Sequence, residues 1–194
     1  MKSNLVLLLA LVAGAAGLVL AAGNSAEKTH KITTISPRKM ADSLRAVIAA
    51  DRQAYAELVQ RLHADERRIT ATENWREAHG LPVPAQMLRQ AAQHIQKQGA
   101  EFSYVLRSLA PINGSNGPQT EAEQAGLAAV AKDPAVNYYT EENLGGRSYF
   151  TAIYADRATL PSCVACHNQH PRSPRRDYQL NDVMGAIVVR VPLE

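Results

Sequence analysis

One short segment, Cys163-Val164-Ala165-Cys166-His167, constrains this chain more than any other part of it. Two thiols three positions apart, followed directly by a histidine, form the pattern to which c-type haem is attached. On a tight turn or a helical turn, residues three apart lie on the same side, so both sulfurs can reach the two vinyl groups on one porphyrin edge. The histidine can then offer a ring nitrogen to the iron. The segment therefore predicts one covalently attached haem c, with His167 as an iron ligand.

Three other interpretations of this segment stay open. Cys163, Cys166, His167 and His170 have the chemistry of a zinc site, although structural zinc modules usually take a second ligand pair from further along the chain. A redox-active dithiol is expected within a strand–helix unit of thioredoxin type. A disulfide across so short a loop would be strained and would constrain little. The chain has 2 cysteines, so haem attachment would use both of them.

The N-terminus predicts export from the cytoplasm. Lys2 precedes an apolar run over residues 5–22, which only two glycines interrupt. Such a segment is a secretory signal peptide or, if it is left uncleaved, an anchor about as long as a bilayer is thick. We therefore expect a signal or anchor over 1–22, a linker over 23–35 and a haem-binding domain over 36–194. The expected location is periplasmic, with membrane attachment only if the N-terminal segment is uncleaved.

Charge is nearly balanced along the chain, at a formal net value of +3. No basic stripe with interleaved aromatic residues is present, so nucleic acid is not an expected partner. The local exception lies just after the haem motif, at Arg172, Arg175 and Arg176. Because guanidinium groups bind carboxylates through paired hydrogen bonds, these arginines are predicted to hold the two haem propionates. A solvated basic loop is the alternative.

The spacing of apolar residues predicts helices first and mostly strands afterwards. The first helix begins at Ser36-Pro37, a capping serine followed by a proline in the first turn. Expected helices cover 36–68, 84–99 and 120–132, and expected strands cover 102–109, 136–140, 148–154 and 183–191. This order predicts an α+β domain with a long N-terminal helix and an antiparallel sheet, and with the haem motif in a loop or short turn. The long helix either covers its own sheet or lies against a second copy, as in a homodimer.

Several segments resemble a bacterial family of c-type-haem-binding domains with a PAS-like fold. These segments are 81–89, 108–113, 146–154, 163–171 and 182–189. The resemblance implies a PAS-like domain that carries a covalent haem. Domains of this family serve as sensory inputs of membrane kinases and chemoreceptors, or stand alone in the periplasm or lumen. Some members take a second iron ligand from a cysteine of the N-terminal helix; here both cysteines are used for attachment, so that ligand differs or is absent.

Met87 is the first choice for the second iron ligand. It follows the rigid Pro82-Val83-Pro84 segment and lies approximately where the resemblance places the cysteine ligand of relatives. A thioether ligand raises the reduction potential of haem, although a methionine on an apolar helix face is as often a core residue. The further candidates are His63, His94, Met184 and Met40. His170 is expected to hydrogen-bond a propionate or a carbonyl, because it lies on the same side as His167.

These observations predict a non-enzymatic haem protein that senses redox state or a small gas. Its signal would pass to a separate membrane signalling protein or through dimerisation. A small periplasmic electron-transfer cytochrome with a redox partner is the alternative, because the same residues serve both functions. A haem enzyme would need a positioned acid or base beside the iron, and no local pair of residues indicates one.

Overall fold

The computed structural model describes residues 34–193 of the 194-residue chain. The predicted signal or anchor over 1–22 and most of the predicted linker over 23–35 lie outside the described residues. No helix within residues 34–193 is both long enough and apolar enough to cross a membrane.

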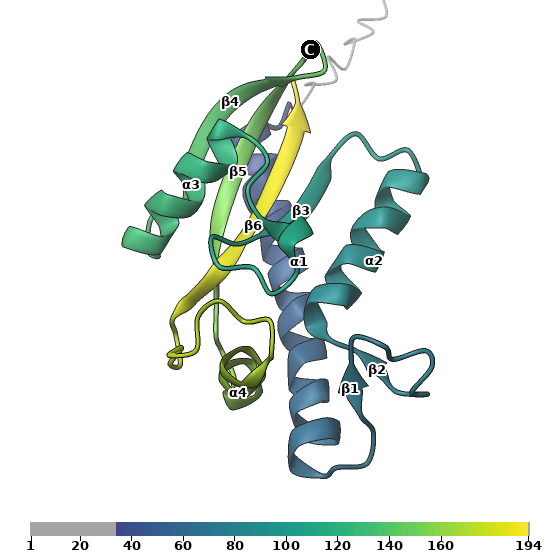
Figure 1. The fold of residues 1–194 in the computed structure, drawn as a ribbon. Helices are drawn as coiled ribbons and strands as arrows, with labels where there is room; N and C mark the ends of the chain where they lie inside the picture. Colours follow the sequence, from purple (N-terminus) through teal and green to yellow (C-terminus); the bar gives the residue numbers. More distant parts are fainter. Residues whose placement is uncertain (1–33, 194) are drawn as a thin grey trace, which may run out of the picture. The chain divides into compact units, whose positions relative to one another are not determined.

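A four-stranded antiparallel sheet is the centre of the fold (Figure 1). Its strands are β3 (Ser103–Arg107), β4 (Tyr138–Leu144), β5 (Arg147–Arg157) and β6 (Val183–Pro192), in the order β3-β6-β5-β4. Gly145 and Gly146 join β4 to β5 with φ values of 60° and 83°, which suit a tight hairpin turn. The α+β class with an antiparallel sheet is confirmed.

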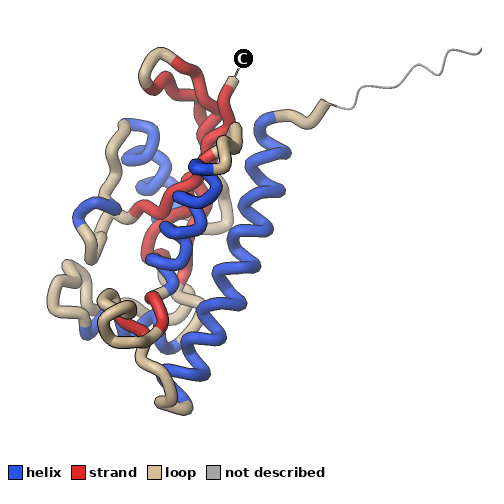
Figure 2. The backbone as a smooth tube through the Cα atoms, turned by 90° about the vertical axis from the view of Figure 1, so that its right-hand side faces the viewer, coloured by secondary structure: helices blue, strands red, loops and turns tan. Residues whose placement is uncertain are grey.

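Helices cover both faces of the sheet. The long helix α1 (Pro37–Val59) and α2 (Pro84–Lys97) pack on one face, and α3 (Glu121–Lys132) packs on the other (Figures 1 and 2). The larger core joins α1 and α2 to alternate residues of the strands, among them Ala152, Tyr154, Ile187 and Val189. The strand residues between them face α3: Ile153, Ala186 and Val188. The central strands are therefore buried on both faces, which explains their nearly continuous apolar sequence.

Side-chain caps fix the starts of two helices where the sequence predicts them. The hydroxyl of Ser36 accepts a hydrogen bond from the Lys39 backbone N–H at 3.3 Å, and that of Thr120 accepts one from Glu123 at 3.1 Å. The end of the first helix differs from the prediction. α1 passes into a π-helix, η1 (Gln60–Asp65), and Arg67 has a φ of 53° that stops helical propagation before residue 68.

The haem motif lies in a helix, α4 (Pro161–Gln169), and the predicted loop or short turn is wrong. Pro161 supplies a fixed φ at the first helical position, and no later residue of the segment breaks a helix. The remaining elements are short: β1 (Ala71–Thr72) pairs with β2 (Leu81–Pro82), and η2 (Gly114–Asn116) is one turn of 3-10 helix. Between the helix α3 and the sheet, Glu123 is buried and lies 2.9 Å from Arg107 and 2.8 Å from Arg190, which also contacts Glu142 at 2.8 Å.

A β-bulge interrupts the β5–β6 pairing at Met184. Asp156 faces Gly185 and Arg157 faces Val183, so Met184 is the extra residue of β6. β6 approaches β3 closely at the bulge, and a Cβ atom added to Gly185 would lie 2.4 Å from the Arg107 carbonyl oxygen. Only glycine fits here, because the obstructing atom belongs to the backbone and cannot rotate away.

Gly185→Ala should therefore reduce the free energy of unfolding by about 1–3 kcal/mol, the usual cost of overpacking. Urea unfolding of the purified protein followed by circular dichroism measures the change. Gly114→Ala is the matched control, since no atom lies within 4 Å of the added Cβ. Equal stability of the two variants would contradict the close approach of β3 and β6.

Candidate functional site

The helix α4 presents the motif to one cavity. Cys163, Cys166 and His167 are three and four positions apart on the helix, so they share a face, and all three line a cavity of about 520 Å³. Cavities that hold cofactors and other small molecules occupy about 300–1,000 Å³. Both thiols are free. The sequence segment that constrained the chain most is thus the wall of a space of cofactor size.

The other walls come from segments distant in the sequence. One face of α1 and η1 contributes residues at intervals of four, three and four: Arg52, Ala56, Val59 and His63. The remaining walls are formed by β1 with the residues after it, the start of α2, the end of β3 with the loop that follows, and the bulge of β6. Representative residues of these walls are Glu73, Ala85, Arg89, Leu106, Pro111 and Met184.

His167 is held in place and kept neutral by its surroundings. Its Nδ1 atom is buried and has no hydrogen-bond partner, and its ring meets that of Tyr178 edge-on at 5.7 Å and 89°. Two hydrogen bonds of 2.9 Å between Asn168 and the Tyr178 backbone fix Tyr178 to α4. Burial, assisted by the charges of Arg52 and His170, lowers the pKa of His167 to about 4. The imidazole is therefore uncharged at neutral pH, and only an uncharged imidazole coordinates a metal.

A buried ion pair lies beside His167 and joins α1 to β5. Arg52 contacts Asp156 at 2.8 Å, and the two side chains are 12% and 9% exposed. Burial raises the pKa of Asp156, and the Arg52 guanidinium opposes that rise. The Nε atom of Arg52 is buried without a partner. Sequence reasoning missed this pair because its members are 104 positions apart and neither belongs to a motif.

The arginines predicted to hold propionates are engaged elsewhere. Arg172 pairs with Glu73, which His170 also approaches at 3.7 Å. Arg175 contacts Asp177 at 2.7 Å and Asp182 at 2.8 Å. Arg176 donates a hydrogen bond to the Pro171 carbonyl oxygen at 2.9 Å, and none of the three arginines lines the cavity. A role of these arginines in holding propionates stays a prediction, since carboxylates and a carbonyl of the protein itself engage their guanidinium groups in this structure.

Met87 as the second iron ligand stays a prediction, and its place in the structure does not favour it. This residue packs against the core formed by α1, α2 and the sheet, and it is not among the residues that line the cavity. Within α2, the cavity is lined by Pro84, Ala85, Gln86 and Arg89. Met40 packs against the same core, and His94 does not line the cavity either.

Two of the alternative ligands do line the cavity, Met184 and His63. Met184 is buried at the bulge and packs with Ala158 and Tyr178, near Cys163. His63 lies in η1, and its Nδ1 accepts a hydrogen bond from the Ala71 backbone N–H at 3.2 Å. A neutral imidazole that accepts at one nitrogen carries its proton on the other, so His63 has an Nε2–H to donate. Single-turn π-helices are frequent at functional sites.

The geometry does not support the alternatives to haem attachment. Within residues 34–193 no three side chains of His, Cys, Asp or Glu are grouped so that they could hold a metal ion, as a zinc site would require. The two thiols form no disulfide. α4 follows an antiparallel strand rather than belonging to a parallel strand–helix unit, as a thioredoxin-type dithiol would.

The fold and the cavity define a class: an α+β domain that presents a Cys-x-x-Cys-His helix to a space of cofactor size. The model of the Tll0287-like family matches residues 24–192, so the chain belongs to the Tll0287-like family. This confirms the family resemblance inferred from the sequence. The fold is similar to that in the crystal structure of the cyanobacterial haem protein Tll0287, with a TM-score of 0.51 and 13% identity over 82% of this chain and 98% of that chain. No curated protein matches the chain.

Arg52→Gln should reduce the free energy of unfolding by about 3 kcal/mol at neutral pH, because it leaves the carboxylate of Asp156 buried without its partner. Arg52→Gln/Asp156→Asn should recover much of this loss, since no charge is then buried. Urea unfolding of both variants measures the difference. A double variant less stable than the single one would show that the pair is not the source of the effect.

Proposed function

We propose that this protein binds one haem covalently, through thioether bonds at Cys163 and Cys166, with His167 as an iron ligand. The observation that carries the proposal is that both thiols and the imidazole line a single cavity from one face of α4. Haem supplies an iron atom that changes its oxidation state and binds small ligands.

The residues present fit this group. The thiols are free, the imidazole is uncharged at neutral pH, and its buried Nδ1 has no partner within the described chain. The cavity has the size expected for a cofactor. The similar fold of a cyanobacterial haem protein agrees with the assignment. The strand order, in which the first strand of the sheet pairs with the last, supports the PAS-like classification.

The surrounding side chains have separate roles. The Tyr178 ring restricts rotation of His167, and the Asn168 hydrogen bonds hold Tyr178. Arg52 places a fixed positive charge near His167 and so disfavours its protonation. His63 directs a hydrogen-bond donor toward the cavity, because its Nδ1 is engaged by Ala71. A donor at this place stabilises a small ligand that accepts a hydrogen bond.

We further propose that the protein is a sensor of redox state or of a small gas rather than an enzyme. Met87, the predicted second ligand, packs in the core, and the lone pair of His63 Nδ1 is already used. The two carboxylates that line the cavity, Glu73 and Asp156, are both paired with arginines and do not act as free acids or bases. A periplasmic location and transmission through a partner or a second copy complete the proposal.

Electron transfer is the second candidate, and His63 is the observation that favours it. If the His63 ring turned by 180° about its Cβ–Cγ bond, Nδ1 would move away from Ala71 and the hydrogen bond to it would be lost. The one ring nitrogen without a proton would then be available to the iron, and two permanent ligands are typical of electron carriers.

Haem should stay with the wild-type protein through acid–acetone extraction, after expression in a host that attaches haem c. Cys163→Ala/Cys166→Ala should lose it, because no sulfur remains to form a thioether. Mass spectrometry of the intact protein measures attachment. Met87→Ala is the control and should keep both the haem and the spectrum of the reduced protein. A wild-type mass equal to that of the bare polypeptide would refute covalent attachment.

The reduced wild-type protein should bind carbon monoxide, and the His63 N–H should lower the C–O stretching frequency by polarising the bound ligand. His63→Phe should raise this frequency, whereas His63→Gln, which keeps a donor, should change it less. Infrared spectroscopy measures the shift. Failure of the wild type to bind carbon monoxide, with binding restored in His63→Phe, would identify His63 as an iron ligand and favour electron transfer.

A further inference from the structure

Three arginines line the cavity, and two of them are already neutralised. Arg52 pairs with Asp156 at 2.8 Å. Arg107 lies 2.9 Å from the buried carboxylate of Glu123 and donates to the Ser115 carbonyl oxygen at 2.9 Å. Arg89 is the third, and within residues 34–193 its guanidinium makes neither an ion pair nor a hydrogen bond. The cavity therefore has one uncompensated positive charge in its wall.

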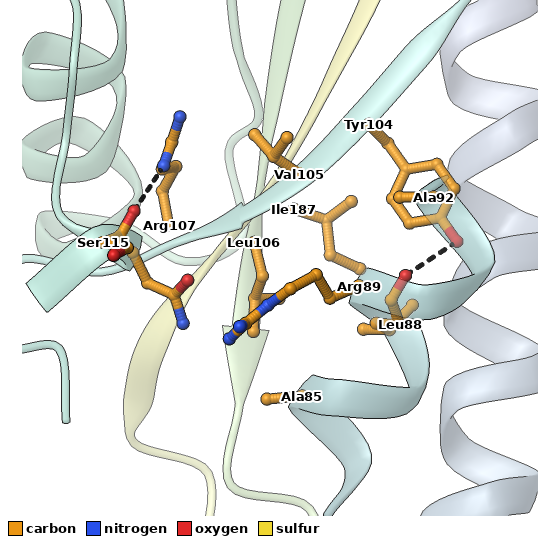
Figure 3. Close-up of a pocket in the computed structure, with 11 residues that line it drawn as sticks. Ala85, Leu88, Arg89, Ala92, Tyr104, Val105, Leu106, Arg107, Ser115 and Ile187 are labelled. Atoms are coloured by element: carbon orange, nitrogen blue, oxygen red, sulfur yellow. Dashed lines mark hydrogen bonds between the residues drawn. The ribbon is translucent and has the colours of Figure 1, made fainter. Parts of the chain in front are cut away.

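Arg89 lies where the cavity meets a smaller pocket of about 210 Å³ and lines both spaces. The smaller pocket lies between α2 and the edge strand β3, and Figure 3 shows the Arg89 side chain reaching from α2 toward Leu106 of β3. The pocket is otherwise mostly apolar, with Leu88, Ala92, Val105 and Ile187 in its walls. Helical spacing places Arg89 directly above Ala85, on the face of α2 that bounds the cavity.

We propose that Arg89 binds a propionate of the haem and is the cation that the sequence assigned to Arg172 and Arg175. The inference rests on the proposed haem function. Haem carries two carboxylates, and a carboxylate moved out of bulk water requires a partner that offsets its loss of hydration. The guanidinium of Arg89 offers paired N–H donors of matching geometry.

Competition among the arginines leads to the same residue. Arg52 and Arg107 would have to abandon buried carboxylates, and an unpaired buried charge is strongly destabilising. Arg172 pairs with Glu73 and Arg175 pairs with Asp182, and neither arginine itself lines the cavity. Arg89 would lose no ion pair or hydrogen bond within the described residues on binding a propionate. It is also exposed, so a propionate paired with it stays near water while the rest of the porphyrin occupies the apolar part of the cavity.

The test uses the full chain with haem attached, in the wild type and in Arg89→Gln, Arg89→Lys and Arg147→Gln. Arg147 is the matched control, because it carries the same charge at the start of β5, outside the cavity lining. Spectroelectrochemical titration measures the midpoint potential of the haem at several pH values. Mass spectrometry of each preparation confirms covalent attachment, so a failure of haem binding is separated from a failure of the Arg89 assignment.

Arg89→Gln should lower the midpoint potential, because loss of a nearby cation favours ferric over ferrous iron. The pH range over which the midpoint potential changes should also shift to higher pH by about one unit, because the guanidinium lowers the pKa of a bound propionate. Arg89→Lys should restore most of both shifts. A potential and pH profile in Arg89→Gln equal to those of Arg147→Gln would overturn the assignment. So would loss of haem in Arg89→Lys as well as in Arg89→Gln, because a retained charge should preserve binding.

Discussion

The ion pair between Arg52 and Asp156 is the contact on which the site depends. It joins α1 to the end of β5, and α4 begins five residues after Asp156. The pair therefore sets the distance between the α1 wall of the cavity and the helix that carries the two thiols. Because both charges are largely shielded from water, removal of either side chain would reduce the free energy of unfolding. Burial is the main cause of the lowered pKa of His167, and the Arg52 guanidinium adds to it, so the ion pair acts on both the cavity wall and the imidazole.

Most arginines at and near the site form ion pairs with carboxylates of the protein. Glu123 pairs with Arg107 and Arg190, Glu73 pairs with Arg172, and Asp182 pairs with Arg175. What remains unpaired is then informative, because burial or partial burial of an unsatisfied polar group is unfavourable without a ligand. Among the described residues that line this cavity, the buried side-chain atoms without a hydrogen-bond partner include Nδ1 of His167, Nε of Arg52 and Oε1 of Gln86, and the exposed guanidinium of Arg89 has no protein partner. A ring nitrogen such as that of His167 can bind a metal, and a guanidinium such as that of Arg89 can bind a carboxylate.

The features that the sequence could predict are those set by neighbouring residues in the chain. Ser36 and Thr120 cap helices where their positions indicate, Gly145 and Gly146 form the hairpin, and the branched residues of β6 form a central strand. The cysteine motif identified one wall of the cavity. The other walls escaped prediction, because Arg52, Arg89 and His63 reach the cavity only through tertiary packing. The packing of Met87 against the core could not be predicted for a related reason: the position of a residue along the chain does not say which face of α2 is turned inward.

The number of residues in the π-helical turn η1 decides whether His63 faces the cavity. A π-helix of one turn accommodates one more residue than an α-helix does, and each residue of an α-helix rotates the next by about 100°. Removal of a single residue from Gln60–Asp65 would swing His63 away from Ala71 and put a neighbour in its place. The side chain that η1 presents to the cavity could thus be exchanged by an insertion or deletion in this turn, with no substitution elsewhere in the cavity lining. Chain length, rather than residue identity, would then be the variable by which such proteins diversify their ligand chemistry.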